Sequence, residues 1–301
     1  MKRKPIYVEL PIESEMDKLW NATQTPDLHE QWDLRFSSIT YLPKKENKPQ
    51  EFTYKTIIGP GLSVEGWGKS AGSFHAKDGS RTSSLHFGTD QVSSIIHEGR
   101  GYWKYIPQSD SSITFLTQYN YKPGLGRIGK LIDQFMFRPL IGWGTALSFD
   151  VLKRWLEQGD SPSSQYVRFF SNWIITLLFS FIWLYHGLVP KIIGLHPAEI
   201  GMVQSAVPIS YIQASWIVLI AGIIEVVFGL VWLVYSKKRQ LFRLQIIIYP
   251  LLTVGAIIAQ PSSAVDPFNP LTFNLALFIL SVVGFMSSKN VPTAKNCKRK
   301  R

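Results

Sequence analysis

The distribution of charged side chains changes at about residue 166. Residues 1–160 carry 20 basic and 18 acidic side chains, which are spread through every stretch. Residues 161–301 carry 12 basic side chains but only three acidic ones, Glu199, Glu225 and Asp266. The first part is therefore typical of a water-soluble domain and the second of a membrane protein.

Four apolar runs in the second part are each long enough to cross a bilayer. A helix rises about 1.5 Å per residue, so about 20 residues span a hydrocarbon core roughly 30 Å thick. The runs cover residues 167–187, 212–235, 240–259 and 271–288. We predict an all-α bundle of four transmembrane helices over 167–289, joined by a linker at 161–166 to a soluble domain over 1–160.

Basic residues flank these runs at one end of the bundle. The segment SKKRQLFR joins the second and third runs, and a basic tail at 290–301 follows the fourth. The loops at 188–211 and 260–270 hold a single basic residue, Lys191. Because cytoplasmic loops collect Lys and Arg, we expect both termini in the cytoplasm of a bacterial cell and the bundle in its plasma membrane. The same rule explains the net charge of +11 without nucleic-acid binding.

Glu225 is the only acid inside a predicted span. It shares a helix face with the small residues Gly222 and Gly229, which favour close helix packing. A carboxyl group at mid-depth costs at least about 2.5–3.5 kcal/mol and needs a partner. Three hydroxyl side chains of other runs reach a similar depth and are its expected partners: Ser180, Thr253 and Ser281. Glu225 either pins the helices together or contacts a proton or ligand, and the sequence leaves both readings open.

A second polar set collects at the outer end of the bundle. His186 ends the first run, Lys191 and Glu199 follow in the loop, and Asn274 lies near the start of the fourth run. These side chains either form a solvated rim or line a binding site. Because His186 is the only histidine in or at the end of a span, a haem held by two facing membrane histidines is not expected.

Three motifs in the second part resemble those of the DoxX-like family. They are WLYHGLVPKIIGLHPAE, the GxxE of residues 222–225, and DPFNPLTFN before the fourth run, and they occur in the family's order. The resemblance covers about residues 167–288 and implies a four-helix membrane fold. Some relatives in this group belong to quinone-coupled redox systems or confer quinone resistance, so the resemblance also suggests a quinone-like ligand.

The soluble part has the element order of an α+β fold. A strand at 6–12 and two short helical segments precede alternating strand-like runs between 36 and 121, and a long helical pattern covers 125–158. Together with DKLWNATQTPDLHEQWD, this order resembles the START-type, or polyketide-cyclase-like (SRPBCC), helix-grip fold over about residues 4–158. The resemblance implies an apolar cavity between a curved sheet and the long helix.

Catalytic signals in the soluble part are weak. The histidines at 75, 86 and 97 are too far apart for a metal-ligand motif, and Cys297 is the only cysteine, so we expect no metal site. No flavin, haem or iron–sulfur motif is evident, and we expect no cofactor. Three aromatic residues on strands could line the cavity or belong to an ordinary core: Trp67, Trp103 and Tyr119.

The expected function is to bind or handle a hydrophobic small molecule, lipid- or quinone-like, at the inner face of the membrane. One alternative is the membrane component of a quinone-linked oxidoreductase or quinone-resistance system, which would need a redox partner protein. A second alternative is small-solute transport or membrane sensing, where four crossings make only a narrow conduit unless the protein forms a homo-oligomer. Membrane lipid is the one partner common to all three, and whether the chain is an enzyme stays open.

Overall fold

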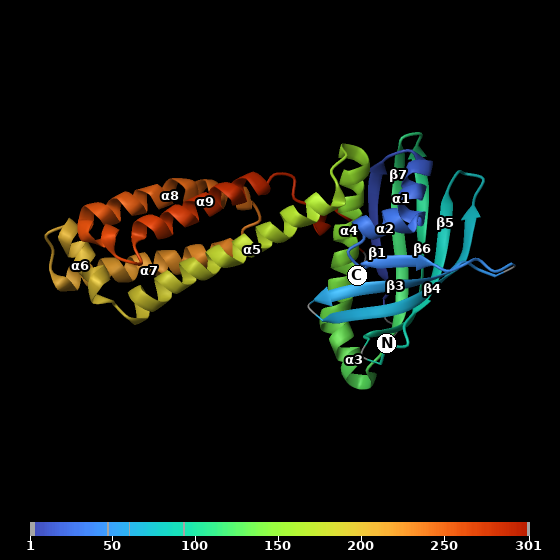
Figure 1. The fold of residues 1–301 in the computed structure, drawn as a ribbon, viewed down its shortest axis with the longest axis horizontal. Coiled ribbons are helices and arrows are strands. Elements are labelled where there is room, and N and C mark those ends of the chain that lie inside the picture. The colour runs from blue at the N-terminus through green and yellow to red at the C-terminus, as the bar shows by residue number, and fades with distance from the viewer. Residues whose placement is uncertain (1–3, 47, 60, 93, 300–301) are drawn as a thin grey trace. The chain divides into compact units, whose positions relative to one another are not determined.

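The computed structural model describes residues 4–46, 48–59, 61–92 and 94–299, which form two units. Unit 1 comprises Met1–Tyr166 together with Pro292–Arg301, and unit 2 comprises Val167–Val291. Each unit has its own buried hydrophobic core, and Figure 1 labels the helices and strands of both units. The predicted two-part organisation of the fold, an α+β soluble part followed by four apolar helices, is confirmed.

Unit 1 contains a seven-stranded antiparallel sheet in the order β1-β7-β6-β5-β4-β3-β2. Two helices lie between β1 and β2, whereas short turns join β4 to β5 and β6 to β7; in the β4–β5 turn Gly79 adopts a φ of 80° that favours glycine. The strands are β1 (Ile6–Glu13), β2 (Ser38–Tyr41), β3 (Glu51–Gly59), β4 (Leu62–His75), β5 (Arg81–Gly88), β6 (Ile96–Ser109) and β7 (Ser112–Pro123).

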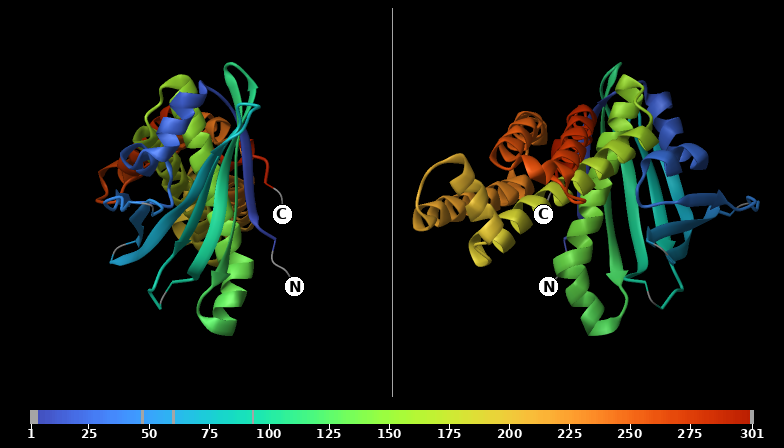
Figure 2. Two further views of the ribbon diagram at one scale, coloured as in Figure 1. Left: turned by 90° about the vertical axis from the view of Figure 1, so that its right-hand side faces the viewer. Right: turned by 60° about the vertical axis from the view of Figure 1, so that its left-hand side comes forward.

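Helices cover one face of this sheet, and the longest of them, α4, runs along it (Figure 2). The predicted long helix at 125–158 is interrupted by a wide π-helical turn just before Pro139, because proline cannot donate the next helical hydrogen bond. The helices are α1 (Met16–Gln24), α2 (Pro26–Trp32), α3 (Gly126–Ile132), the π turn η1 (Asp133–Phe137) and α4 (Arg138–Gln158). This arrangement is helix-grip-like, as the sequence predicted.

The C-terminal segment is a structural part of unit 1 rather than a free basic tail. Asp150 of α4 accepts hydrogen bonds from the backbone N–H of Thr293 (2.9 Å) and from Asn296 Nδ2 (2.7 Å). Cys297 is buried, and its thiol donates to the carbonyl oxygen of Ala146. The sequence could not show this packing because it joins residues about 146 positions apart, although Lys300 and Arg301 lie outside the described residues.

Unit 2 contains four helices that are long and apolar enough to span a membrane. The first is α5 (Pro162–His186), continued by the π-helical η2 (Gly187–Ile193), and the others are α7 (Tyr211–Val234), α8 (Lys238–Ala259) and α9 (Pro270–Ser287). The expected linker at 161–166 is therefore mostly the first turn of α5. Between the spans lie a short helix that was not predicted, α6 (Pro197–Ala206), and a single 3-10 turn, η3 (Pro261–Val265).

Large aromatic side chains fill the centre of unit 2. Phe179, Trp232 and Phe242 are fully buried, and the centroids of the Trp232 and Phe242 rings are 4.9 Å apart. Gly284 of α9 lets the Phe242 ring approach, since a Cβ there would lie 2.2 Å from it. Many outward-facing apolar side chains remain exposed, as expected of helices whose solvent is lipid.

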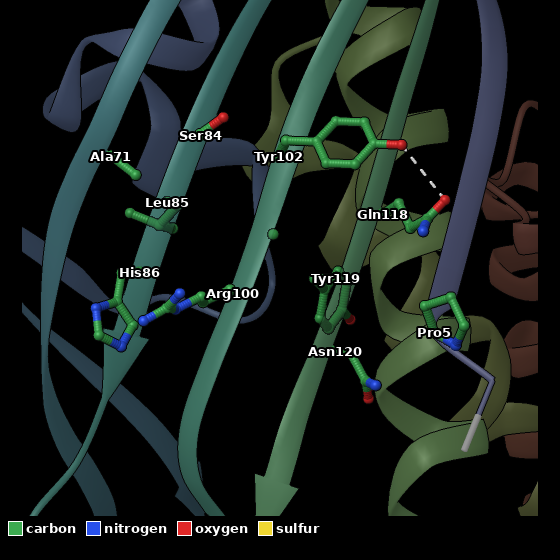
Figure 3. Close-up of a pocket in the computed structure, with 11 residues that line it drawn as sticks. Pro5, Ala71, Ser84, Leu85, His86, Arg100, Tyr102, Gln118, Tyr119 and Asn120 are labelled. Atoms are coloured by element: carbon green, nitrogen blue, oxygen red, sulfur yellow. Dashed lines mark hydrogen bonds between the residues drawn. The ribbon is translucent and has the colours of Figure 1, made fainter. Parts of the chain in front are cut away.

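The face of the sheet opposite the helices is polar and slightly hollowed. A hollow of about 540 Å³ opens there over β5, β6 and β7 (Figure 3). Strand alternation places Arg100 and Tyr102 in this hollow, whereas Trp103 points to the helix side.

Candidate functional site

The interior of unit 1 is fully packed on one side and accessible on the other. Against α4, the inward side chains Val8, Ile12 and Phe115 have essentially no exposed surface. Toward α2, β3 and β5, five aromatic rings on the helix side of the sheet stay only half-buried: Phe36, Phe52, Tyr54, Phe87 and Trp103. A close-packed core leaves no such surface, so these rings can still contact an apolar partner.

Glycines on neighbouring strands let some of these rings lie against the sheet. A Cβ on Gly68 would lie 2.2 Å from the Phe52 ring, and one on Gly99 would lie 2.5 Å from the Phe87 ring. Any other residue at either position would push the ring away from the sheet. The paired glycine and aromatic residues therefore give β3–β6 a flat aromatic inner surface.

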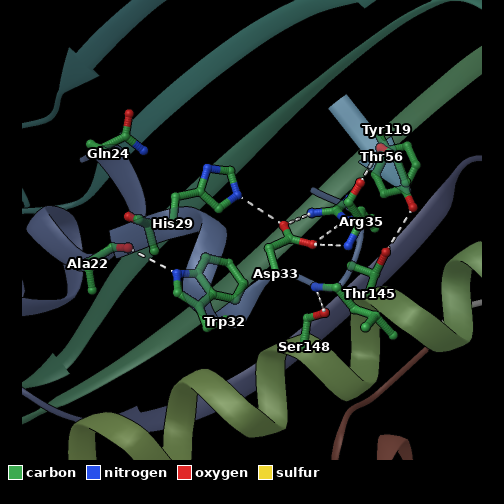
Figure 4. Close-up of polar contacts among 12 residues, drawn as sticks. Ala22, Gln24, His29, Trp32, Asp33, Arg35, Thr56, Tyr119, Thr145 and Ser148 are labelled. Carbon is green, nitrogen blue, oxygen red and sulfur yellow. Dashed lines mark hydrogen bonds and ion pairs between the residues drawn. The ribbon is translucent and has the colours of Figure 1, made fainter. Parts of the chain in front are cut away.

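A buried ion pair lies beside this surface (Figure 4). The guanidinium of Arg35 donates to both carboxylate oxygens of Asp33, from Nε over 2.8 Å and from Nη2 over 2.6 Å. His29 Nε2 lies 3.0 Å from the same carboxylate. Nearby, the hydroxyls of Tyr119 and Thr145 are 2.9 Å apart, which joins β7 to α4.

The charge state of this pair follows from its surroundings. Burial by itself raises the pKa of Asp33, but the charge and hydrogen bonds of Arg35, with a smaller contribution from His29, outweigh it and hold that pKa well below its usual range. Burial raises the pKa of the Tyr119 hydroxyl. Asp33 is therefore ionised and Tyr119 neutral at physiological pH.

The geometry is suited to binding an apolar molecule that has one polar end. The His29 ring is enclosed by Trp32, Trp103 and Phe36 at centroid distances of 5.1, 4.9 and 5.1 Å. Arg35 has five N–H donors, and its two bonds to the Asp33 carboxylate leave others for a ligand. Because Asp33 is saturated by these bonds, it is a support for Arg35 rather than a free base.

The sequence did not single out His29, Asp33 or Arg35 as site residues. A signal was present in LHEQWDLRF, where His29 and Asp33 are four residues apart and Arg35 follows two later. Such spacing is common on helix surfaces, so it indicates a site only once the aromatic surroundings are known.

The three cavity candidates from the sequence do not all lie in the interior. Trp103 and Tyr119 lie in the interior. The Trp103 ring packs edge-on against His29, and the Tyr119 hydroxyl contacts Thr145 of α4. Trp67 lies on the opposite face of the sheet, where its ring meets His86 edge-on at 5.1 Å. Strand alternation decides this, because Trp67 pairs with Gly88, one position out of phase with the inward Phe87.

In unit 2 a charged cluster joins η2, α6 and α7. Lys191 Nζ lies 3.0 Å from Glu225 Oε2 and 3.4 Å from Glu199 Oε1. The ammonium group thereby compensates the one carboxylate within a predicted span, which reduces the cost of placing it among apolar helices. The expected partners of Glu225 were wrong, because their hydroxyls bond to backbone carbonyls nearby: Ser180 to Gly229, Thr253 to Tyr249 and Ser281 to Leu277.

Two glycines make this ion pair possible. A Cβ on Gly187 would lie 2.5 Å from the carbonyl oxygen of Gly222, and one on Gly222 would lie 2.8 Å from the Lys191 Cβ. The close approach lets η2, which contains Pro190, follow α7 until Lys191 reaches Glu225. Two of the motifs singled out in the sequence, separated by about 30 residues, therefore meet at one contact.

The other two membrane candidates, His186 and Asn274, form no ion pair with this cluster in the described part of the chain, although His186 lies within electrostatic range of Lys191 and Glu199. The His186 ring packs against Phe273 of α9 at 5.6 Å. Asn274 lines an apolar groove between α8 and α9 with Tyr249 and Thr253. Of the five residues, Lys191, Glu199 and Glu225 are thus ion-paired, and His186 lies close to this cluster.

Comparison with known proteins supports the membrane assignment. Residues 180–282 match the model of the DoxX-like family, in agreement with the resemblance seen in the motifs. The chain is 47% identical over 208 residues to the uncharacterized membrane protein YndG of Bacillus subtilis (strain 168), covering 67% of this chain and 76% of YndG. The chain belongs to the same family as YndG. Like YndG, it is a membrane protein, and four of its helices are candidate spans.

Solved structures are similar to the chain over about half its length. A STAR-related lipid transfer protein fragment from Xanthomonas axonopodis is 17% identical with a TM-score of 0.39, covering 50% of this chain and 84% of that one. A START superfamily protein from Mycobacterium smegmatis is 11% identical with a TM-score of 0.39, covering 52% and 100%. START proteins are thus among the structural neighbours of this YndG relative.

Proposed function

We propose that unit 1 binds a hydrophobic small molecule between its sheet and helices, and that unit 2 keeps this binding domain at a membrane. One observation carries the proposal: five inward aromatic rings remain half-buried while the inward side chains against α4, such as Val8, Ile12 and Phe115, are fully buried. Contact of such rings with an apolar ligand would contribute roughly 25 cal/mol per Å² of surface removed from water.

The Asp33–Arg35 pair would set the orientation of the ligand. The guanidinium carbon of Arg35 lies 5.5 Å from the centre of the Tyr119 ring, at the edge of the aromatic surface. Two hydrogen bonds to the Asp33 carboxylate hold the guanidinium there. A carbonyl, hydroxyl or carboxylate at one end of the ligand would accept from its remaining N–H groups. Lipid-like and quinone-like molecules both have this combination of an apolar body and an oxygen-bearing end.

The same proposal places unit 1 and both chain ends in the cytoplasm, beneath the plasma membrane of a bacterial cell. Tyr166 and Pro292, which flank unit 2, both belong to unit 1. With unit 1 on one side, both ends of the bundle would lie on that side of the membrane, as an even number of spans allows. The basic residues of the α7–α8 connection favour the cytoplasmic side. A green fluorescent protein fused to the C-terminus would fluoresce in cells only with this orientation.

The test compares two tryptophans on opposite faces of the sheet in the full-length protein. Native mass spectrometry of wild-type protein from a mild detergent should show an apolar molecule bound at a defined mass. Trp103→Gln should lower its occupancy at least tenfold, since the loss of one buried aromatic contact costs on the order of 2 kcal/mol. Trp67→Gln, on the polar face, is the matched control and should retain it.

Two results would count against this function. One is a folded wild-type protein that is consistently empty and takes up no oleate or ubiquinone-1 when these are added. The other is equal loss of ligand from both tryptophan variants, which would place the molecule outside the interior. Circular dichroism on each variant separates loss of binding from loss of fold.

A second candidate function is quinone handling by unit 2. It is favoured by the Lys191–Glu225 pair, which places a carboxylate and an ammonium group 3.0 Å apart at apolar helices. Glu225→Gln should then abolish quinol turnover in membranes while the protein remains inserted. Unchanged turnover would leave the pair with a purely structural role.

A further inference from the structure

The polar face of the sheet in unit 1 carries a hollow that the proposed interior site does not use (Figure 3). Its origin is a lack of side-chain volume. Ala71 is the extra residue of a β-bulge in β4, between Ser70 and Gly72, and carries only a methyl group, and Ser84 of β5, which pairs with Tyr102, also has a short side chain. The space between Arg100 and Tyr102 on β6 and the neighbouring strands therefore stays open.

Two amides of β7 present their donor groups to this hollow. The Gln118 Oε1 atom accepts from the Tyr102 hydroxyl over 3.3 Å. The Asn120 Oδ1 atom accepts from Arg138 Nη1 and from the backbone N–H of Tyr121, each over 3.0 Å. Because both carbonyl oxygens are occupied, the NH₂ groups of these amides are what remains to bind a ligand.

The charge in the hollow is positive. Arg100 makes no hydrogen bond or ion pair within the described part of the chain, and none of the described residues that line the hollow is acidic. Figure 3 shows its guanidinium extended toward the His86 ring. The nearby carboxylate of Glu98 is already engaged by His86 at 2.7 Å and by Lys122 at 3.5 Å, which lowers its pKa and leaves Arg100 uncompensated.

We infer that this hollow is a binding site for an oxyanion, a phosphate monoester group, held by Arg100 with the amides of Gln118 and Asn120. Arginine is suited to this role because its planar donors match two oxygens of one phosphate group. A volume of about 540 Å³ exceeds a single phosphate and lies within the range of small-molecule pockets, so the anion would be part of a larger molecule. The group could belong to a soluble metabolite or to a lipid headgroup. The site does not depend on the interior ligand, since it lies on the other face of the sheet.

The experiment uses full-length protein in a mild detergent and two classes of probe. The soluble probes are inorganic phosphate and glycerol 3-phosphate, with glycerol as the uncharged control, measured by isothermal titration calorimetry. The lipid probe is phosphatidic acid against phosphatidylcholine, measured as retained lipid by native mass spectrometry. Arg100→Gln is the test variant, and Lys104→Gln removes the same charge from the same strand outside the hollow.

We expect Arg100→Gln to weaken binding of the phosphate probes at least tenfold and Lys104→Gln to change it less than twofold. Binding of the soluble probes would identify a metabolite site, and binding of phosphatidic acid alone would identify a headgroup site; either result supports the inference. Equal weakening by both variants would show general charge attraction and overturn it. Absence of binding by every phosphate probe would overturn it as well, without bearing on the interior ligand.

Discussion

The hydroxyl of Tyr166 donates a hydrogen bond to the carbonyl oxygen of Trp32 over 2.5 Å. Tyr166 lies in the first turns of α5, the helix that continues into the first span, whereas Trp32 ends α2 immediately before Asp33. A second contact of the same kind joins Gln165 Nε2 to the carbonyl oxygen of Val151 in α4, over 3.1 Å. The start of the membrane helix is therefore built into the domain that we propose binds the ligand.

Removing the Tyr166 hydroxyl tests this anchoring. Tyr166→Phe should lower the free energy of unfolding of unit 1 by about 1–2 kcal/mol, because the buried Trp32 carbonyl loses its donor. Thermal unfolding followed by circular dichroism in detergent measures the change. Tyr185→Phe, an exposed tyrosine further along α5, is the control and should leave the midpoint unchanged. Equal shifts in both variants would contradict the anchoring.

Replacing the Asp33 carboxylate should show how much the buried ion pair contributes to the free energy of unfolding. Asp33→Asn leaves Arg35 buried without a counter-charge, so we expect a loss of about 3–5 kcal/mol at pH 7. Because the folded pKa of Asp33 is lowered, the wild type has this stabilisation above the ordinary pKa of 3.8 and loses it as pH falls toward the folded value. Urea unfolding should therefore show a smaller difference between wild type and variant at pH 3 than at pH 7. Asp110→Asn, at an exposed turn, should show neither effect.

The docking of the C-terminal segment can be followed through Cys297, the only cysteine in the chain. Burial raises the pKa of its thiol to about 12, so in the wild type it should react slowly with a maleimide at pH 7.5. Asp150→Ala removes the acceptor for Thr293 and Asn296, releases the segment, and should speed labelling at least tenfold. Asp90→Ala, at an exposed loop, should leave the rate unchanged. Fast labelling of the wild type would show that the segment is not docked.

The close contact of η2 with α7 predicts a steric effect at one glycine. Gly222→Ala would place a Cβ 2.8 Å from the Gly187 carbonyl oxygen, and we expect a loss of about 1–3 kcal/mol from the displaced Lys191–Glu225 contact. Gly255→Ala in α8 is the matched control, since nothing lies within 4 Å of its Cβ position. Thermal stability of the two variants in the same detergent should differ, and equal midpoints would contradict the contact.

Much of the fold could be predicted from the sequence, because it depends on local patterns. Runs of about 20 apolar residues identify membrane spans wherever they occur, and alternation identifies strands in the same way. The boundaries were less accurate where the deciding interaction is not local. Residues 161–166 were predicted to be a linker, but Gln165 and Tyr166 bond to residues of α4 and α2 and belong to a helix.

The sequence by itself determined the division into a soluble domain and four spans, the helix-grip order of the soluble part, and the motifs of the DoxX-like segment. Only the tertiary structure decided which polar groups meet. No periodicity in the sequence distinguishes the following pairs from solvated polar groups: Arg35 with Asp33, Lys191 with Glu225, and Asp150 with Asn296. The face on which Trp67 lies was likewise open until the strand register was known, because a shift of one residue exchanges the two faces of a strand.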